Sequence, residues 1–376
     1  MAGLYIHIPF CRQKCNYCNF YFTTSLRYKE EMIDTILKEI AWQKDYLQGE
    51  KIKTIYIGGG TPSILAVKDL QRIFDKVFDT FEVTDSPEIT LEANPDDLSK
   101  RKLTMLKTTP VNRFSIGVQS FSNEDLRYLN RAHDSHQAEN AIRNAREAGF
   151  ENLTIDLIYG IPTLSYVKWK DHLRKVVELD IPHFSAYALT VEPKTTLAHL
   201  IGKGKTQPVN EEQSARQFEM LMDFAEANGY DHYEISNFAL SGRISKHNSS
   251  YWLGSKYLGI GPAAHSYNGN SRQWNIANNI RYMKSIAQKT IPFEKELLTQ
   301  TDRYNEYVLT GMRTKWGCDI QKIAAFGTAY KVHFEIAAEP FLVTGKVHQQ
   351  DGIYRLTPNG MMLADFITSA LFLSPG

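Results

Sequence analysis

The stretch that decides the fold lies at the N-terminus and reads Leu4-Tyr-Ile-His-Ile-Pro-Phe-Cys11-Arg-Gln-Lys-Cys15-Asn-Tyr-Cys18. Its first five residues, Leu4 to Ile8, have the apolar and β-branched character of a buried strand. Pro9 cannot donate a backbone hydrogen bond, and polar residues separate the cysteines, so we expect the chain to leave the sheet here as a loop. The sequence thus predicts three thiols close together at the end of a first strand.

Three interpretations fit this C-x-x-x-C-x-x-C spacing. The thiols could share one buried face of a helix, because positions four and seven apart lie on the same side. A zinc site usually needs four protein ligands, often in paired C-x-x-C units, and the sequence has no second pair. Three thiolates suit an iron–sulfur cluster with one iron open to a small molecule. We therefore predict a [4Fe–4S] cluster on Cys11, Cys15 and Cys18.

Composition supports a soluble chain with sizeable cores. The 376 residues are 43% hydrophobic and 23% charged, with a formal net charge of +1. Nothing in this balance favours nucleic acid or an anionic membrane as a partner. We see no signal peptide and no apolar run of the ~20 residues that a spanning helix needs, so a cytoplasmic location is expected. In that reducing compartment the four cysteines are not expected to form disulfides.

Short β-type runs alternate with amphipathic helical patterns over the first 230 residues. This alternation is typical of a parallel sheet built from βαβ units, and right-handed crossovers would curl it into a partial barrel. The fold class is therefore α/β, a partial (β/α)6 barrel resembling an incomplete TIM barrel. The expected strands are Leu4–Ile8, Lys53–Ile57, Glu88–Glu92, Arg113–Val118, Leu153–Ile158 and Phe184–Thr190, and the expected helices are Tyr28–Asp45, Leu65–Phe81, Gln137–Ala148, Tyr166–Glu178 and Glu211–Asn228.

The rest of the chain divides into two further parts. Residues 231–267 are irregular in pattern, so we expect a connecting segment over 236–300 between a barrel at 1–235 and a C-terminal unit at 301–376. The C-terminal unit has three helical patterns, then strands expected at 342–347 and 353–356. Thr357-Pro358 then has the chemistry of a helix start. These elements predict a small winged-helix-like α+β domain.

The other strand ends carry residues suited to a ligand. Gly58-Gly59-Gly60-Thr61-Pro62 lets backbone amides approach a bound group, although a tight turn would also use one or two glycines. Glu92 ends the third strand. An acid at such a position is solvated or caps a helix about as often as it binds a ligand. Gln119 follows the fourth strand, and Asp156 lies between apolar neighbours, where burial is costly unless it is paired. Because ligand groups collect at the carboxyl ends of barrel strands, we expect these side chains to converge.

With these motifs, the chain resembles the radical S-adenosylmethionine (SAM) superfamily. The resemblance implies that the amino and carboxylate groups of SAM bind the open iron and that electron transfer cleaves its sulfonium bond. It also implies that the residues at the matching positions line the SAM site. These are Tyr5, Tyr17, Gly59, Gly60, Thr61, Glu92, Gln119, Arg131 and Asp156.

Over residues 4–376 the chain is similar to the oxygen-independent coproporphyrinogen III oxidase group, and within it to the haem-chaperone family HemW. The true dehydrogenase of that group has a further cysteine where this chain has Phe20, and an N-terminal extension where only ten residues precede Cys11. His247-Asn-Ser-Ser-Tyr251-Trp252 fits a His-Asn-x-x-Tyr-Trp motif of the chaperones. The resemblance implies haem contact at His247, whereas from the residues alone a turn packed on the core is favoured.

The function expected from the resemblance is a haem chaperone that carries a [4Fe–4S] cluster and SAM and passes haem to acceptor haemoproteins such as respiratory-chain enzymes. The alternative is a coproporphyrinogen III dehydrogenase; no residue is assigned a catalytic role, and enzyme activity stays open. Expected partners are haem, an acceptor and an electron donor, with any membrane contact transient and through the acceptor. Monomer and dimer both stay open. Cys318 is expected to be structural.

Overall fold

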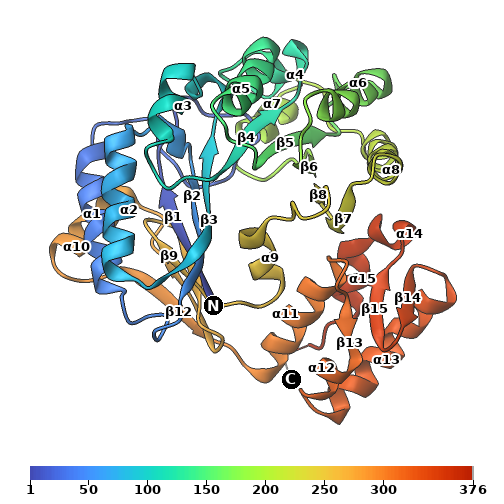
Figure 1. Ribbon diagram of the computed structural model, residues 1–376. Helices are drawn as coiled ribbons and strands as arrows, with labels where there is room; N and C mark the ends of the chain where they lie inside the picture. Colours follow the sequence, from blue (N-terminus) through green and yellow to red (C-terminus); the bar gives the residue numbers. More distant parts are fainter. Residues whose placement is uncertain (375–376) are drawn as a thin grey trace.

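A curved mixed sheet forms the centre of the protein, which a computed structural model describes over residues 1–374. Six strands run parallel in chain order and curl into a partial barrel that stays open on one side (Figure 1). The sheet order is β12-β11-β10-β9-β1-β2-β3-β4-β5-β6-β8-β7. The predicted partial (β/α)6 barrel is therefore confirmed. Its strands are β1 (Ala2–Ile8), β2 (Ile52–Gly59), β3 (Val83–Ala93), β4 (Arg113–Gln119), β5 (Leu153–Tyr159) and β6 (His183–Ala188).

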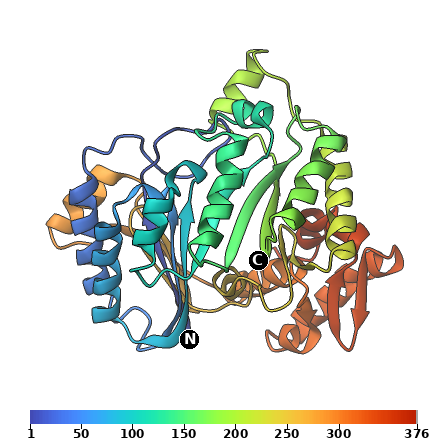
Figure 2. The ribbon, with the colours of Figure 1, turned by 45° about the horizontal axis from the view of Figure 1, so that its top comes forward.

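Helices cover the outer face of the barrel, as both ribbon views show (Figures 1 and 2). Strands β1 and β5 are buried at six of their seven residues, as expected for a parallel sheet whose outer face lies under helices. The expected helices all form, with ends within two or three residues of the predictions. The helices of this layer are α1 (Lys29–Trp42), α2 (Val67–Thr80), α3 (Lys100–Leu106), α5 (Ser135–Glu147), α6 (Tyr166–Glu178) and α8 (Glu211–Ala227). The short helices α4 (Asn123–Tyr128) and α7 (Thr196–Gly202) lie at the carboxyl ends of the strands, where each is hydrogen-bonded to Asn16 (Figure 2).

The segment predicted as an irregular connection instead extends the barrel, so that prediction was wrong. Strand β9 pairs in parallel with β1, and Leu258 and Ile260 join the main core. These strands are only three to five residues long, too short for a period-two pattern to be recognised in the sequence. The elements are β7 (Asp231–Glu234), β8 (Asn237–Ala239), α9 (Lys246–Trp252), β9 (Tyr257–Ile260), β10 (His265–Tyr267), β11 (Ser271–Asn275), α10 (Asn279–Ala287) and β12 (Phe293–Leu297).

The C-terminal unit packs around its own core of helices and a three-stranded sheet. The strand expected at 342–347 was wrong, because α13 continues through Pro340 to Val343 and β14 begins only at Val347. A short apolar run does not distinguish a strand from the end of a helix. Thr357 caps α14 and Pro358 is its first residue, as predicted. The elements are α11 (Gln300–Met312), β13 (Cys318–Asp319), α12 (Ile320–Ala324), α13 (Thr328–Val343), β14 (Val347–Gln350), β15 (Ile353–Leu356), α14 (Pro358–Met361) and α15 (Ala364–Ala370).

The C-terminal unit sits against the edge of the sheet that β7 forms. A bridge pairs Glu234 with Thr314, and the Ile235 amide donates to the Arg313 carbonyl at 3.1 Å. The Ile235 side chain packs against both hydrophobic cores. The unit thereby covers an edge strand and faces the open side of the barrel (Figures 1 and 2). We propose boundaries at residues 235 and 300 between the three parts of the chain, and strands of the middle part extend the barrel sheet.

Candidate functional site

The three N-terminal cysteines lie in a loop that crosses the carboxyl ends of the barrel strands. Backbone hydrogen bonds fix the loop, from the Cys11 amide to the Thr23 carbonyl and from the Asn16 amide to the Leu129 carbonyl, both 3.0 Å. Arg12 adds an ion pair of 2.7 Å to the buried carboxylate of Asp97. Because Asp97 lies beyond β3 and Leu129 beyond β4, two strand ends hold the loop over the barrel.

The donors around the thiols fit an iron–sulfur cluster. Thr61 donates to the Cys11 sulfur and Arg131 to the Cys15 sulfur, each at 3.4 Å, and such bonds stabilise thiolates. Burial raises the pKa of the Cys11 thiol to about 11, so a bound cation is needed to keep it ionised at neutral pH. Among residues 1–374, no three or more His, Cys, Asp or Glu side chains are grouped to hold a single metal ion. A cluster spreads its thiolates over separate irons and does not need such a group.

Each of the three consecutive glycines at the end of β2, Gly58 to Gly60, has a close neighbour that leaves no room for a side chain. A Cβ on Gly60 would lie 2.6 Å from the Phe10 carbonyl oxygen and 3.0 Å from the Cys11 sulfur. Gly59 has φ +113°, and a Cβ there would lie 2.7 Å from the His7 ring. A Cβ on Gly58 would meet Glu92 Oε1 at 2.9 Å. The glycine run therefore lets the backbone pass directly under the cysteine loop.

Two buried carboxylates lie at the next strand ends. Glu92 accepts a hydrogen bond from the Tyr56 hydroxyl at 2.8 Å and one from the Gly59 amide at 3.1 Å. Asp156 accepts one from Ser115 at 3.4 Å. Burial raises the pKa of Glu92 to about 7, and repulsion from the Asp156 carboxylate adds to this shift. Burial also raises the pKa of Asp156, to about 6. Both groups can therefore bind or lose a proton near neutrality, or ionise fully against a cationic ligand.

Arg131 connects the thiols to the strand ends. Its guanidinium donates to the Asn94 side chain at 2.7 Å, to the Gly117 carbonyl at 2.8 Å, and to Cys15 as described above. Gln119 ends β4 with φ +65°, a backbone conformation that residues other than glycine rarely adopt. Strain of this kind is common where a side chain is aimed at a functional site. Asn94 was not predicted as a site residue, although it follows Glu92 by only two positions.

These residues line a single cavity of about 1350 Å³. It extends from the cysteine loop across the strand ends to the C-terminal unit, where Arg313, Met361, Met362 and Phe366 also line it. The sequence missed this far end, because nothing local marks those residues as facing the barrel. Of the thirteen predicted site residues, the cavity brings together eleven: Cys11, Cys15, Tyr17, Cys18, Gly59, Gly60, Thr61, Glu92, Gln119, Arg131 and Asp156.

The other two predicted residues, Tyr5 and His247, lie beneath the cavity and do not line it. His247 is 1% exposed, and its ring nitrogens share hydrogen bonds with Thr54 at 2.8 Å and with Tyr251 at 2.9 Å. With both nitrogens occupied, the imidazole has no lone pair for an iron in this structure. The ring stacks on Tyr56 at 4.9 Å, and the Tyr5 ring stacks on the same Tyr56 from 6.1 Å. In this structure both rings support Tyr56 under Glu92, and the ligand contacts expected for Tyr5 and His247 stay predictions.

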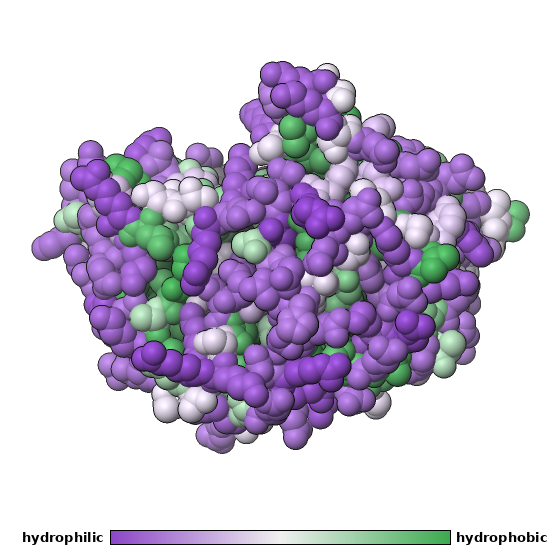
Figure 3. All heavy atoms as spheres, turned by 90° about the horizontal axis from the view of Figure 1, so that it is seen from above, coloured by the Kyte–Doolittle hydropathy of each residue, from purple (hydrophilic) through white to green (hydrophobic). Residues whose placement is uncertain are grey.

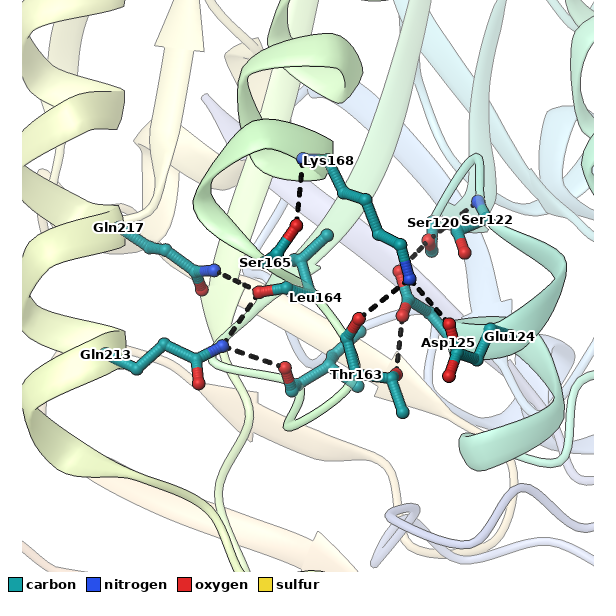
Figure 4. A network of polar contacts seen from close by, with 11 residues as sticks. Ser120, Ser122, Glu124, Asp125, Thr163, Leu164, Ser165, Lys168, Gln213 and Gln217 are labelled. Carbon is teal, nitrogen blue, oxygen red and sulfur yellow. Dashed lines mark hydrogen bonds and ion pairs between the residues drawn. The ribbon is translucent and has the colours of Figure 1, made fainter.

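A polar network supports the strand ends on the β4–β5–β6 side (Figure 4). Asp125 accepts hydrogen bonds from Ser120 at 2.8 Å and from Thr163 at 2.5 Å, which ties the turn after β4 to the loop after β5. Gln217 of α8 accepts from the Gly160 amide and donates to the Leu164 carbonyl, both at 2.7 Å. Helix α8 thus fixes the loop that directly follows Asp156 and its strand.

The surface above the strand ends is mainly hydrophilic, with hydrophobic side chains exposed in small groups (Figure 3). Among the described helices, none is both long and apolar enough to cross a membrane.

Cys318 is fully buried in the C-terminal core, as expected for a structural thiol.

Comparison with known proteins places these features in one family. Residues 5–176 match the model of the radical SAM superfamily, and residues 298–363 match the HemN C-terminal domain. The chain is 36% identical to the heme chaperone HemW of Bacillus subtilis, over 98% of this chain and 99% of that protein. It is 30% identical to heme chaperone HemW of Mycobacterium tuberculosis, over 98% and 94%.

Among solved structures, the chain resembles the coproporphyrinogen III oxidase HemN of Escherichia coli, described as a radical SAM enzyme. The TM-score is 0.85, with coverage of 99% of this chain and 90% of that one. The sequences are only 22% identical, so this likeness supports the fold and not the reaction.

Proposed function

The chain belongs to the HemW family of radical SAM proteins, and we propose that it is a haem chaperone that binds haem and transfers it to acceptor haemoproteins. The observation that carries the proposal is similarity to heme chaperone HemW over 98% of the chain, including the C-terminal unit that closes the cavity. The cavity supports it, because about 1350 Å³ exceeds the ~300–1000 Å³ of most single-ligand pockets.

Within this proposal, Cys11, Cys15 and Cys18 hold the [4Fe–4S] cluster that the radical SAM family implies. When bound, that cluster would supply an open iron for SAM and an electron for cleavage of its sulfonium bond. The amides of Gly59 and Gly60 approach the ligand closely because neither residue carries a side chain.

The remaining polar residues orient SAM. Glu92 and Asp156 attract its positively charged groups, and Thr61, Gln119, Tyr17 and Arg131 fix the thiols and the polar edge of the site. Ionisation of the two raised carboxylates is favoured by a cationic ligand, which partly offsets their burial.

The proposed partners are haem, acceptor haemoproteins such as respiratory-chain enzymes, and an electron donor, in the cytoplasm. Transient contact with a membrane would come through the acceptor, and both monomer and dimer are compatible with the fold.

The test is haem binding and transfer by anaerobically reconstituted protein. We expect a stable Soret shift on haem titration, and movement of that haem to apomyoglobin used as an acceptor. A chain that holds no haem under these conditions would overturn the proposal.

The dehydrogenase alternative is tested in the same preparation. Phe20 stands where the dehydrogenase has a further cysteine, and its phenyl ring is exposed at the cavity and cannot bind iron. We therefore expect no protoporphyrinogen from coproporphyrinogen III and SAM under reducing conditions. Catalytic formation of that product would replace the chaperone proposal with the dehydrogenase.

A further inference from the structure

The end of the cavity remote from the cysteines is apolar and lies between the barrel and the C-terminal unit. Leu363 and Phe366 line it from the C-terminal side, and Tyr187 and Val191 from the loop after β6. These four side chains are 38–65% exposed, although large apolar side chains are usually buried. An exposed apolar lining inside a cavity marks a binding surface for an apolar ligand.

Two thioethers stand in this part of the cavity. Met361 and Met362 both line it, at the end of α14. Met361 packs against both hydrophobic cores, and Met362 packs against the barrel core although it belongs to the C-terminal unit. Both side chains therefore lie where the two units face each other.

We propose that this outer end of the cavity is the haem site and that the Met361–Met362 pair supplies a thioether ligand to the haem iron. The inference rests on the proposed function and deepens it by naming the site and the ligand.

The choice of ligand follows from the donors that the cavity offers. No histidine is among the described residues that line it, and both nitrogens of His247 are engaged beneath it. The three cysteines stand at the opposite end. The Tyr187 phenol is neutral at neutral pH and would have to lose its proton to bind iron as a phenolate. A thioether needs no deprotonation, and Met is an established axial ligand of haem.

Arg313 gives the same end of the cavity a cation for a haem carboxylate. It and Arg131 are the only basic residues among the described lining residues, and Arg131 is committed to the thiol end. Arg313 pairs at 2.6 Å with Asp365, whose side chain is 87% exposed, and more loosely, at 3.6 Å, with buried Glu234. Its guanidinium stands 5.8 Å from the centre of the Trp252 ring. So exposed an ion pair is worth little, and a haem carboxylate can take the place of Asp365. This places the Trp252 of the His-Asn-x-x-Tyr-Trp motif beside the haem site, without iron ligation by His247.

The experiment compares cluster-reconstituted full-length protein with the double variant Met361→Leu/Met362→Leu. Leucine keeps the apolar volume and removes the sulfur, so folding should be retained. Ferric haem is titrated, and we record the dissociation constant, the near-infrared charge-transfer band of a thioether–iron bond and the haem reduction potential. We expect the band to disappear, the potential to fall and the dissociation constant to rise by about tenfold, with iron and sulfide content unchanged.

Met105→Leu on α3, a partly exposed methionine that does not line the cavity, is the matched control and should behave as wild type. A variant that binds haem with an unchanged band and affinity would overturn the thioether site while leaving the chaperone proposal intact. Absence of haem binding by the wild type would instead overturn the chaperone proposal itself. If the double variant unfolds, the single variants are measured, and the one that loses the band identifies the ligand; retention of the band in both refutes the inference.

Discussion

At the scale of single residues, Gly60 shows how the cysteine loop depends on the absence of a side chain. Gly60→Ala would put a Cβ 2.6 Å from the Phe10 carbonyl oxygen, a backbone atom that cannot rotate away. We expect the loop to shift and the protein to retain less than half of its iron and sulfide after anaerobic reconstitution. Metal and sulfide analysis per chain measures this directly.

The control for Gly60→Ala is Gly202→Ala at the end of α7, where an added Cβ meets nothing within 4 Å. It should reconstitute like the wild type. Full iron loading of Gly60→Ala would show that the loop adapts and that the close approach is not needed.

At the scale of elements, Gln217 joins helix α8 to the loop after β5. It is fully buried, and both ends of its amide are bonded, to Gly160 and to Leu164. Gln217→Leu would leave the buried Gly160 amide without an acceptor, at about 1–3 kcal/mol, whereas the Leu164 carbonyl keeps its second donor, Gln213. We therefore expect a loss of about 1–3 kcal/mol in unfolding free energy by urea denaturation. Glu212→Ala, exposed on the same helix, should change it by less than about 0.5 kcal/mol.

Glu39 joins a second set of elements and gives stability a pH dependence. It is fully buried in α1 and accepts hydrogen bonds from the Gly261 amide, from Asn275 and from the Tyr282 hydroxyl. Burial raises its pKa to about 7, against about 4.3 for glutamate in an unfolded chain. Between these values the folded state keeps a proton that the unfolded state has lost. The stability from this group is therefore complete below about pH 4 and is lost as the pH rises to about 7.

Glu39→Gln should remove this contribution. Between about pH 4.5 and 7 we expect the unfolding free energy to fall less in the variant than in the wild type. The difference between the two falls should be of order 3 kcal/mol. Above pH 7 the two curves should run in parallel. The measurement is a series of denaturant titrations across this range. Curves that stay parallel throughout would mean that Glu39 keeps its ordinary pKa.

At the scale of the whole molecule, Ile235 couples the barrel to the C-terminal unit. Its side chain packs against both cores, and its amide holds the Arg313 carbonyl. Ile235→Ala should lower the unfolding free energy by about 1–3 kcal/mol, since the side chain is only partly buried. It should also make the unfolding of the two units less cooperative. We expect calorimetry to show a broader transition, or two. Ile336→Ala, on an exposed face of α13, should leave the transition unchanged.

Sequence separation explains which parts of the site could be predicted from the sequence. Cys11, Cys15 and Cys18 lie within eight residues, so spacing alone predicted that their thiols meet. The strand ends were predicted because each βαβ unit is local and parallel strands must end on one side. The short strands β7 to β12 were missed because each is only three to five residues long. Strand β9, which joins the later ones to the barrel, pairs with β1, more than 200 residues away.

The sequence by itself determined the parallel barrel, the cysteine loop and the family to which the chain belongs, because each depends on neighbouring residues. Only the tertiary structure decided that the nitrogens of His247 are occupied, since Thr54, one of their partners, lies 193 residues away. It also decided that Met361 and Met362 face the barrel. Packing between distant segments sets which side chains remain free to bind a ligand, and no local pattern records it.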